Sequence, residues 1–208
     1  MTLRPCICLA LLYFGLSEIA SGNAATPFSL GIPLPEGAAS GMIEISFLYN
    51  KAEGVVPSYQ IAIWLESEKG EYVKTLFVSE YLSGGGFDHG DVCPDWAKQA
   101  HWEKAEESEF DAATRPTPPI GARTLKFECE KWGIAPGAYR YCVQAHIVEK
   151  YNILYRGRIT IGQGAAEAVG EVLYSPGKHP LAADILYDVR ARYVPRGESN
   201  SSIKKEKP

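Results

Sequence analysis

Short segments in which apolar and polar residues alternate, separated by turns, constrain the fold of this chain more than any other feature. Alternation with a period of two is typical of half-buried β-strands. On this basis we predict about seven strands: 41–49, 59–65, 72–79, 123–132, 138–148, 151–161 and 182–194. Helical segments do not alternate with these strands, so a parallel sheet built from βαβ units is disfavoured.

A segment of different character interrupts the strands. A glycine-rich loop covers 82–95, and Pro94 followed by Asp95 is typical of the first turn of a helix. We therefore predict a short helix over 94–106, after which a proline-rich loop over 114–121 returns the chain to strands. Together these segments predict a mainly all-β fold, an immunoglobulin-like antiparallel β-sandwich with one short helical insertion.

The N-terminal residues have the order of a secretory signal peptide. Arg4 precedes an apolar run over 7–16, and Gly22 and Ala24 stand at the small-residue positions of a cleavage site. The run has about half the length that a membrane-spanning helix needs, which favours a cleaved signal over an uncleaved anchor. We therefore predict a signal peptide over 1–24 and a periplasmic or secreted mature chain without membrane insertion.

The mature chain is predicted to be one domain. Residues 25–196 would form the β-sandwich and the polar residues 197–208 a disordered tail. Hydrophobic residues make up 46% of the chain, which is enough for a core. The formal net charge of −4 argues against nucleic acid as a partner, because a nucleic-acid binder presents a basic surface.

Three cysteines follow the predicted signal peptide. Cys129 and Cys142 stand almost symmetrically about the turn 133–137, so a hairpin closed by that turn would place them opposite each other. An oxidising compartment favours a disulfide between them if their β carbons come close enough. Two buried thiols on the core face are the alternative. In the disulfide case Cys93 is left over as a spare thiol.

A second group of candidate residues lies on the glycine-rich loop and the helix after it: His89, Asp91, Cys93 and His101. Imidazole and thiolate ligands suit zinc or copper, so the set indicates a metal-binding hypothesis. The spacing matches no established site and lacks a C-x-x-C pair. The alternative is that these are exposed polar residues on a loop.

The segment 110–118 (F-D-A-A-T-R-P-T-P) resembles the acceptor motif of proteins that carry covalently attached flavin mononucleotide (FMN). When the segment is aligned with that motif, Asp111 matches the aspartate and Thr114 matches the first hydroxyl residue. Thr117 then matches the residue that would form the phosphoester bond. An arginine and a proline stand at 115–116, where the motif has a small Gly-Ala pair, and proline restricts the backbone. The alternative is a connector stiffened by proline.

No recognised catalytic motif occurs in the chain. The sequence contains no G-x-S-x-G, no H-E-x-x-H and no P-loop. Its four histidines have no serine or cysteine partner in a recognised catalytic context. We therefore expect a role other than catalysis.

Four stretches carry a resemblance to a known family: P-S-Y-Q-I-A-I-W-L-E-S-E-K-G-E-Y-V-K-T-L-F-V-S, C-P-D-W, D-A-A-T-R-P-T-P and G-A-Y-R-Y. Over 41–162 the chain resembles the predicted periplasmic proteins of domain of unknown function 2271. Relatives typically read D-A-V-T-G-A-T-P where this chain reads D-A-A-T-R-P-T-P. Members often accompany flavin-transferring enzymes and membrane proteins of the PepSY type. The resemblance therefore implies an envelope partner in a redox or metal-uptake setting.

We therefore expect an exported, non-enzymatic accessory or binding domain that works with an envelope redox or metal-uptake system. One alternative is a covalent FMN carrier for electron transfer, with Thr117 as the acceptor. Another alternative is a metal-binding protein that uses the loop around Cys93.

Overall fold

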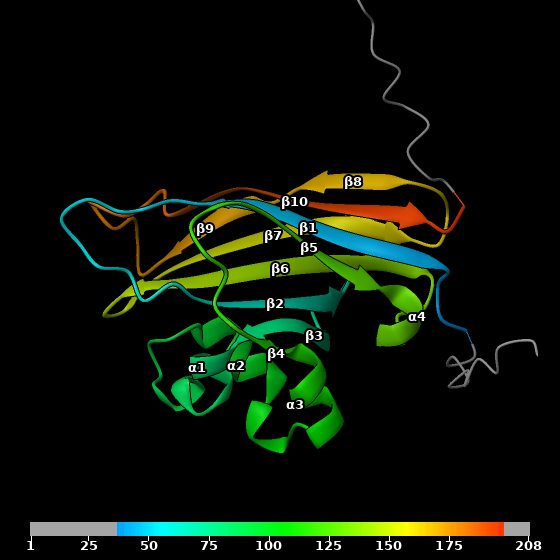
Figure 1. Cartoon of the computed structure of the whole chain (residues 1–208), viewed down its shortest axis with the longest axis horizontal. Helices are drawn as coiled ribbons and strands as arrows, with labels where there is room; N and C mark the ends of the chain where they lie inside the picture. Colours follow the sequence, from blue (N-terminus) through cyan, green and yellow to red (C-terminus); the bar gives the residue numbers. More distant parts are fainter. Residues whose placement is uncertain (1–36, 198–208) are drawn as a thin grey trace, which may run out of the picture. The chain divides into compact units, whose positions relative to one another are not determined.

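The computed structural model describes residues 37–197, which form two β-sheets (Figure 1). Sheet A has the strand order β5 (Gly121–Glu128), β1 (Gly41–Tyr49), β10 (Leu186–Pro195) and β8 (Ala166–Val169). Sheet B has the strand order β4 (Thr114–Arg115), β3 (Tyr72–Ser79), β2 (Gln60–Ser67), β6 (Gly137–Val148), β7 (Tyr151–Ile161) and β9 (Glu171–Ser175). All neighbouring strands are antiparallel except the short pair β3 and β4. The predicted mainly β sandwich is confirmed, and its immunoglobulin-like arrangement stays a prediction.

Several predictions concern residues outside this range. The signal peptide over 1–24, the start of the domain at residue 25 and the tail beyond Gly197 lie outside the described residues. Within the described part of the chain, no helix has the length and apolar character needed to cross a membrane.

The first hydrophobic core lies between the two sheets. β1 buries every second side chain, including Ile43, Ile45 and Phe47, while the side chains between them are only partly buried. Sheet B contributes Ile63 and Val143 to the same core. No element within residues 37–197 covers the outer face of sheet A in this way, which explains why β1 alternates between apolar and polar residues.

The second hydrophobic core lies on the other face of sheet B, beneath a helical cover formed by residues 80–113 (Figure 1). The cover consists of α1 (Glu80–Ser83), η1 (Gly86–Asp88), α2 (Pro94–Ala100), η2 (Trp102–Lys104) and α3 (Glu107–Ala113). Trp64 of β2 belongs to the same buried cluster as Trp96 and Trp102 of the cover. Because both faces of sheet B are covered, β2 is buried without alternation over most of its length.

Two amide side chains of sheet B fix the cover in place. The Asn152 side chain accepts a hydrogen bond from the backbone N–H of Cys93 (3.0 Å) and donates one to the carbonyl of Asp91 (2.8 Å). The Gln144 side chain accepts one from the backbone N–H of Trp96 (3.1 Å). Both amides are buried, and buried polar groups need such partners. The insertion is therefore longer than the predicted single helix and is an integral layer of the fold.

The main helix of the cover is shorter than the sequence predicts. α2 begins at Pro94, as expected, but ends at Ala100 instead of near residue 106. His101 has a φ of 47°, in the left-handed region, which stops the helix. The rest of the predicted helix becomes η2 and the approach to α3.

The hairpin between 123–132 and 138–148, on which the Cys129–Cys142 bridge depended, is not formed. The first of these strands ends at Glu128, where the helical turn α4 (Cys129–Trp132) begins. Gly133, with a φ of 63°, ends that turn. The chain then passes from sheet A to sheet B, so β5 pairs with β1 while β6 pairs with β2 and β7.

Three short strands, β4, β8 and β9, are also absent from the sequence-based expectation of about seven strands. β4 has two residues, and β9 has four of its five residues exposed. Segments this short and this exposed carry no clear hydrophobic alternation. The described residues therefore contain more strands than the periodicity indicates.

Tyr141 links the two sheets at the edge where the chain passes from β8 to β9. It lies on β6 of sheet B, and its hydroxyl donates a hydrogen bond to the carbonyl of Ala168 in sheet A (3.0 Å). Gly157 of β7 lies against its ring, because a Cβ placed there would be 2.6 Å from ring carbon Cε1. A Cβ on Gly170 would lie 3.2 Å from the Tyr141 hydroxyl. Small residues at both positions make room for this link.

We expect Gly157→Ala to lower the free energy of unfolding by about 1–3 kcal/mol, the usual cost of overpacking. The Tyr141 ring cannot move away easily because it is fully buried and held by its hydrogen bond. Denaturant unfolding followed by fluorescence would measure the effect. Gly177→Ala is the matched control, since a Cβ there meets no atom within 4 Å. If the two variants are equally stable, the Tyr141 ring does not limit the space at residue 157 and the prediction is wrong.

Candidate functional site

The structure does not bring together the four residues predicted as metal ligands: His89, Asp91, Cys93 and His101. Cys93 is fully buried beneath the cover, and its Sγ lies 3.6 Å from backbone carbonyl oxygens of β2 and β6. His89, Asp91 and His101 are exposed instead. Residues 37–197 contain no group of three side chains placed to hold a metal ion. Because Cys93 faces the sheet while the other three face solvent, the predicted ligand set does not converge.

The residues of the flavin-like motif lie at the end of the cover. Asp111 is exposed on α3. The Thr114 hydroxyl lies 2.7 Å from the Ser83 hydroxyl, which accepts a hydrogen bond from the Trp102 indole at 3.2 Å. Thr117 lies in the irregular loop between β4 and β5 and is partly exposed. Thr114 thus belongs to a polar network inside the cover, whereas Thr117 is in an irregular segment.

The predicted disulfide between Cys129 and Cys142 is not formed, and all three cysteines among the described residues are free. Cys129 lies in α4 and packs in the core between the sheets, whereas Cys142 lies on β6 and faces the cover. The bridge required the β5–β6 hairpin, which the structure does not contain. The alternative of buried thiols describes both residues, although they lie in different cores.

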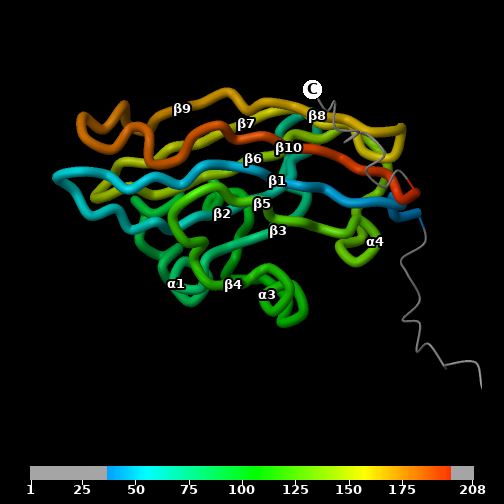
Figure 2. Tube along the Cα trace, turned by 45° about the horizontal axis from the view of Figure 1, so that its top comes forward, coloured from blue at the N-terminus to red at the C-terminus, as the bar shows by residue number. Residues whose placement is uncertain are grey.

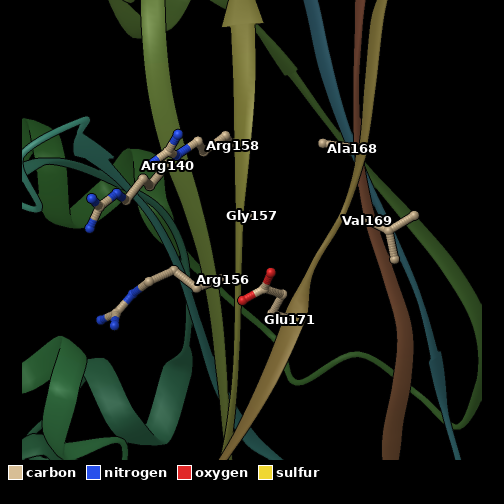
Figure 3. Close-up of a pocket in the computed structure, with 7 residues that line it drawn as sticks. All are labelled: Arg140, Arg156, Gly157, Arg158, Ala168, Val169 and Glu171. Carbon is tan, nitrogen blue, oxygen red and sulfur yellow. The ribbon is translucent and has the colours of Figure 1, made fainter.

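A candidate site that the motifs do not reveal lies at the edge of sheet B. It is an open pocket of about 530 Å³ (Figure 3), which we call the arginine pocket. Its lining comes from four strands: Arg140, Arg156, Gly157, Arg158, Ala168, Val169 and Glu171. Pockets that hold small ligands have volumes in this range.

The strand pairing places the three arginines of this pocket on one face. Arg156 and Arg158 are two residues apart on β7, so their side chains leave the same side of the sheet. Arg140 of β6 is the direct cross-strand partner of Arg158. Gly157, between the two arginines of β7, faces the opposite side toward Tyr141. Figure 3 shows the three arginine side chains on one side of β7.

Arg156 neutralises a buried carboxylate. Its Nη2 lies 3.3 Å from Oε1 of Glu66, whose side chain is only 1% exposed. The Trp64 indole donates a second hydrogen bond to the same carboxylate oxygen, at 3.1 Å. The Arg156 Nε also donates to Sγ of Cys142, at 3.4 Å. A buried carboxylate is unfavourable without a cation and hydrogen bonds, so Arg156 has a structural role within the pocket.

Arg140 and Arg158 form no such ion pair within the described part of the chain, although Arg140 is also the cross-strand partner of Glu66 and its guanidinium lies beside Gly70. Among residues 37–197, neither forms a salt bridge with an acidic side chain. Like charges directly opposite each other on neighbouring strands destabilise a sheet. An anion at this position would relieve that repulsion, and guanidinium groups bind carboxylate and phosphate oxygens through paired N–H donors. The arrangement is therefore suited to binding an anionic group.

The sequence alone does not show that the residues of this pocket lie close together. Y-R-G-R over 155–158 shows that two arginines share a face of a strand, and G-A-Y-R-Y over 137–141 contains the third. Their convergence depends on the register in which β6 and β7 pair. The overall charge of −4 gives no sign of a local excess of arginine.

Comparison with known proteins identifies a family. A protein-family model described as "Predicted periplasmic protein (DUF2271)" matches residues 42–173, which is more than half of the chain. The matched range includes every residue that lines the arginine pocket. Comparisons with curated proteins and with solved structures gave no match.

The three described thiols are expected to react slowly in the folded protein. Burial raises the pKa of Cys129 to about 11 and raises the pKa values of Cys93 and Cys142 further. At pH 8 very little of the reactive thiolate is then present. We expect an alkylating reagent to modify these thiols only after urea is added, as measured by intact mass. Rapid labelling of the native protein, or peptide mapping that finds a Cys129–Cys142 bridge, would contradict this expectation.

Proposed function

We propose that this chain, which belongs to the family of predicted periplasmic proteins called domain of unknown function 2271 (DUF2271), is an accessory binding domain. Its arginine pocket would hold an anionic group of a partner in the cell envelope. The observation that carries this proposal is the cross-strand pair of Arg140 and Arg158 at the pocket, neither of which forms a salt bridge within the described residues.

The charge balance of the pocket supports binding of an anion. Three arginines lie near three acidic groups there: Glu171 in the lining, the buried Glu66 behind it, and Asp95 of the cover, whose charge acts on Arg156. Glu66 is occupied by Arg156, and Glu171 is exposed at the rim. The remaining guanidinium groups can share a carboxylate or a phosphate between them. Because the pocket is open to water, we expect binding to weaken with salt.

The setting of the proposed partner comes from the family resemblance. That resemblance implies an envelope redox or metal-uptake system, and we propose that the anionic group belongs to a protein of such a system. A metal-binding function for the Cys93 loop is not proposed, because Cys93 is buried away from the histidines that would share the metal.

Inorganic phosphate and polyglutamate are suitable probes of the arginine pocket. We expect both to bind the mature protein, as measured by calorimetry and by NMR shifts at β6 and β7. The double substitution Arg140→Gln/Arg158→Gln should weaken binding by about tenfold or more, the loss expected for about 1.4 kcal/mol. Raising salt from about 50 to about 500 mM should also weaken binding.

Arg192→Gln is the matched control for this experiment. Arg192 is an exposed strand arginine on β10 of sheet A, outside the arginine pocket. Its substitution should leave binding unchanged. Equal losses in the control and in the double variant, or no binding of either probe to the parent protein, would remove the proposal.

A second candidate function is that of a covalent FMN carrier with Thr117 as the acceptor. The supporting observation is that Thr117 lies partly exposed in an irregular loop, where a flavin transferase could reach its hydroxyl. Asp111, the aspartate of the motif, is exposed nearby in the sequence. The proline at residue 116 limits the conformations available to this loop.

Co-expression with a flavin transferase tests this second candidate. If Thr117 is the acceptor, the intact mass rises by one FMN group, flavin absorbance appears and Thr117→Ala abolishes both. Thr160→Ala is the control, because Thr160 is an exposed threonine on β7 outside the motif. A colourless product with unmodified mass would eliminate the carrier function and leave the first proposal unaffected.

A further inference from the structure

One edge of β7 beside the arginine pocket has no hydrogen-bonded neighbour among the described strands, although β8 of sheet A lies near it, and we call this segment the open edge. β9 pairs with β7 from Asn152 to Arg156, and its last pair joins Arg156 to Glu171. Over residues 157–161, β7 pairs with β6 on one side, while no described strand pairs with its other side. This open edge has about the length of a common β-strand.

The open edge exists because the chain changes sheets next to it. The backbone N–H of Gly170, directly before β9, bonds to the carbonyl of Val189 in sheet A at 2.9 Å. β8 then pairs with β10 of sheet A instead of continuing along β7. In Figure 2, β8 and β9 follow each other at the top of the view, near β10 and β7. The arginine pocket, lined by both β7 and β8, marks the place that a continued β9 would have occupied.

The side chains of the open edge alternate between a charged face and an apolar face. Arg158 and Thr160 are exposed on the face that carries the arginine cluster of the pocket. Ile159 and Ile161 point to the opposite side, into the core between the sheets. The side chains of a strand added here would alternate between the same two faces. Every second residue would lie beside Arg158 and would be polar, and the residues between would lie beside the core and would be apolar.

The positive charge of Arg158 and Arg140 determines which kind of strand can pair with the open edge of β7. Within the chain itself, β9 places Glu171 directly opposite Arg156. By the same geometry an incoming acidic residue would lie opposite Arg158, in line with Arg140 on the next strand. A second copy of this chain is disfavoured, since pairing the two edges antiparallel about Arg158 would place arginine opposite arginine.

We propose that the open edge of β7 over 157–161 binds an extended acidic segment of a partner protein as an added β-strand. Main-chain hydrogen bonds to β7 would hold the segment, and an acidic side chain would bind to Arg158 and Arg140. The segment would alternate acidic and small apolar residues. This inference rests on the proposed anion-binding function and specifies its ligand as a polypeptide carboxylate.

A peptide with the core Val-Glu-Val-Glu-Val, flanked by Gly-Ser, is the probe. Its pattern reads the same in both directions, so it can pair parallel or antiparallel. We expect it to bind the mature protein and to slow hydrogen exchange of backbone amides within 157–161 by about tenfold or more. Arg140→Gln/Arg158→Gln should weaken its binding by about tenfold or more, whereas Arg192→Gln should not change it.

Two control peptides separate strand addition from simple charge attraction. Val-Val-Glu-Glu-Val keeps the composition but breaks the alternation, and a fully N-methylated version of the probe keeps the side chains but removes every N–H donor. Both should bind at least about fivefold more weakly than the probe.

The outcomes distinguish this inference from the function on which it rests. Equal binding of all three peptides, or protection confined to β9 with none at 157–161, would overturn strand addition at this edge. If phosphate and polyglutamate bind through the arginines but the probe gives no protection of 157–161, the inference fails and the anion-binding function stands. If none of these ligands binds, both fail.

Discussion

The fold depends on the coverage of sheet B from both sides. Where both faces of a sheet are covered, it can contain polar side chains only if the protein supplies their hydrogen-bond partners. Gln144 and Asn152 therefore bind the backbone of the cover, and Glu66 is held by Trp64 and Arg156. These interactions set the position of the cover and the orientation of Arg156.

The pocket and the open edge share one cause, which is the passage of the chain between sheets. At Gly170 the chain leaves sheet A for sheet B, and the link through Tyr141 requires small residues there and at Gly157. Because β9 begins only at Glu171, part of β7 is left without a neighbour within the described residues. The change of sheets at Gly170, beside the Tyr141 side chain, thus accounts for both the arginine pocket and the unpaired backbone of β7 next to it.

The main strands could be predicted from sequence because burial on one face leaves a local periodic signal. The segments 41–49, 72–79 and 151–161 match β1, β3 and β7 in the structure. Sheet membership could not be predicted in this way. The alternation of 123–132 is equally compatible with pairing to β6 or to β1, and only tertiary packing decides between them. The predicted Cys129–Cys142 bridge failed for that reason.

The candidate sites were harder to predict because a site requires side chains that point toward one another, and the order of residues does not show where a side chain points. Cys93 stands close in sequence to two potential ligands, but its left-handed backbone (φ 47°) accompanies a thiol buried against sheet B. Arg140 and Arg158 belong to none of the site motifs considered from the sequence, and their proximity arises from the register of two strands. Spacing in the sequence therefore grouped residues that the fold separates, and it did not indicate the cluster of arginines that the strands bring together.

The unequal covering of the two sheets has an evolutionary consequence. On the outer face of sheet A, Glu44 and Ser46 interact with Lys126 and Thr124 across strands, in contacts that other polar pairs could replace. On sheet B nearly every position of β2 touches one of two cores, so a substitution there must suit its neighbours. Homologues should therefore diverge quickly on the outer face of sheet A and slowly at every position of β2, and comparison of their sequences would reveal the layer order without a structure.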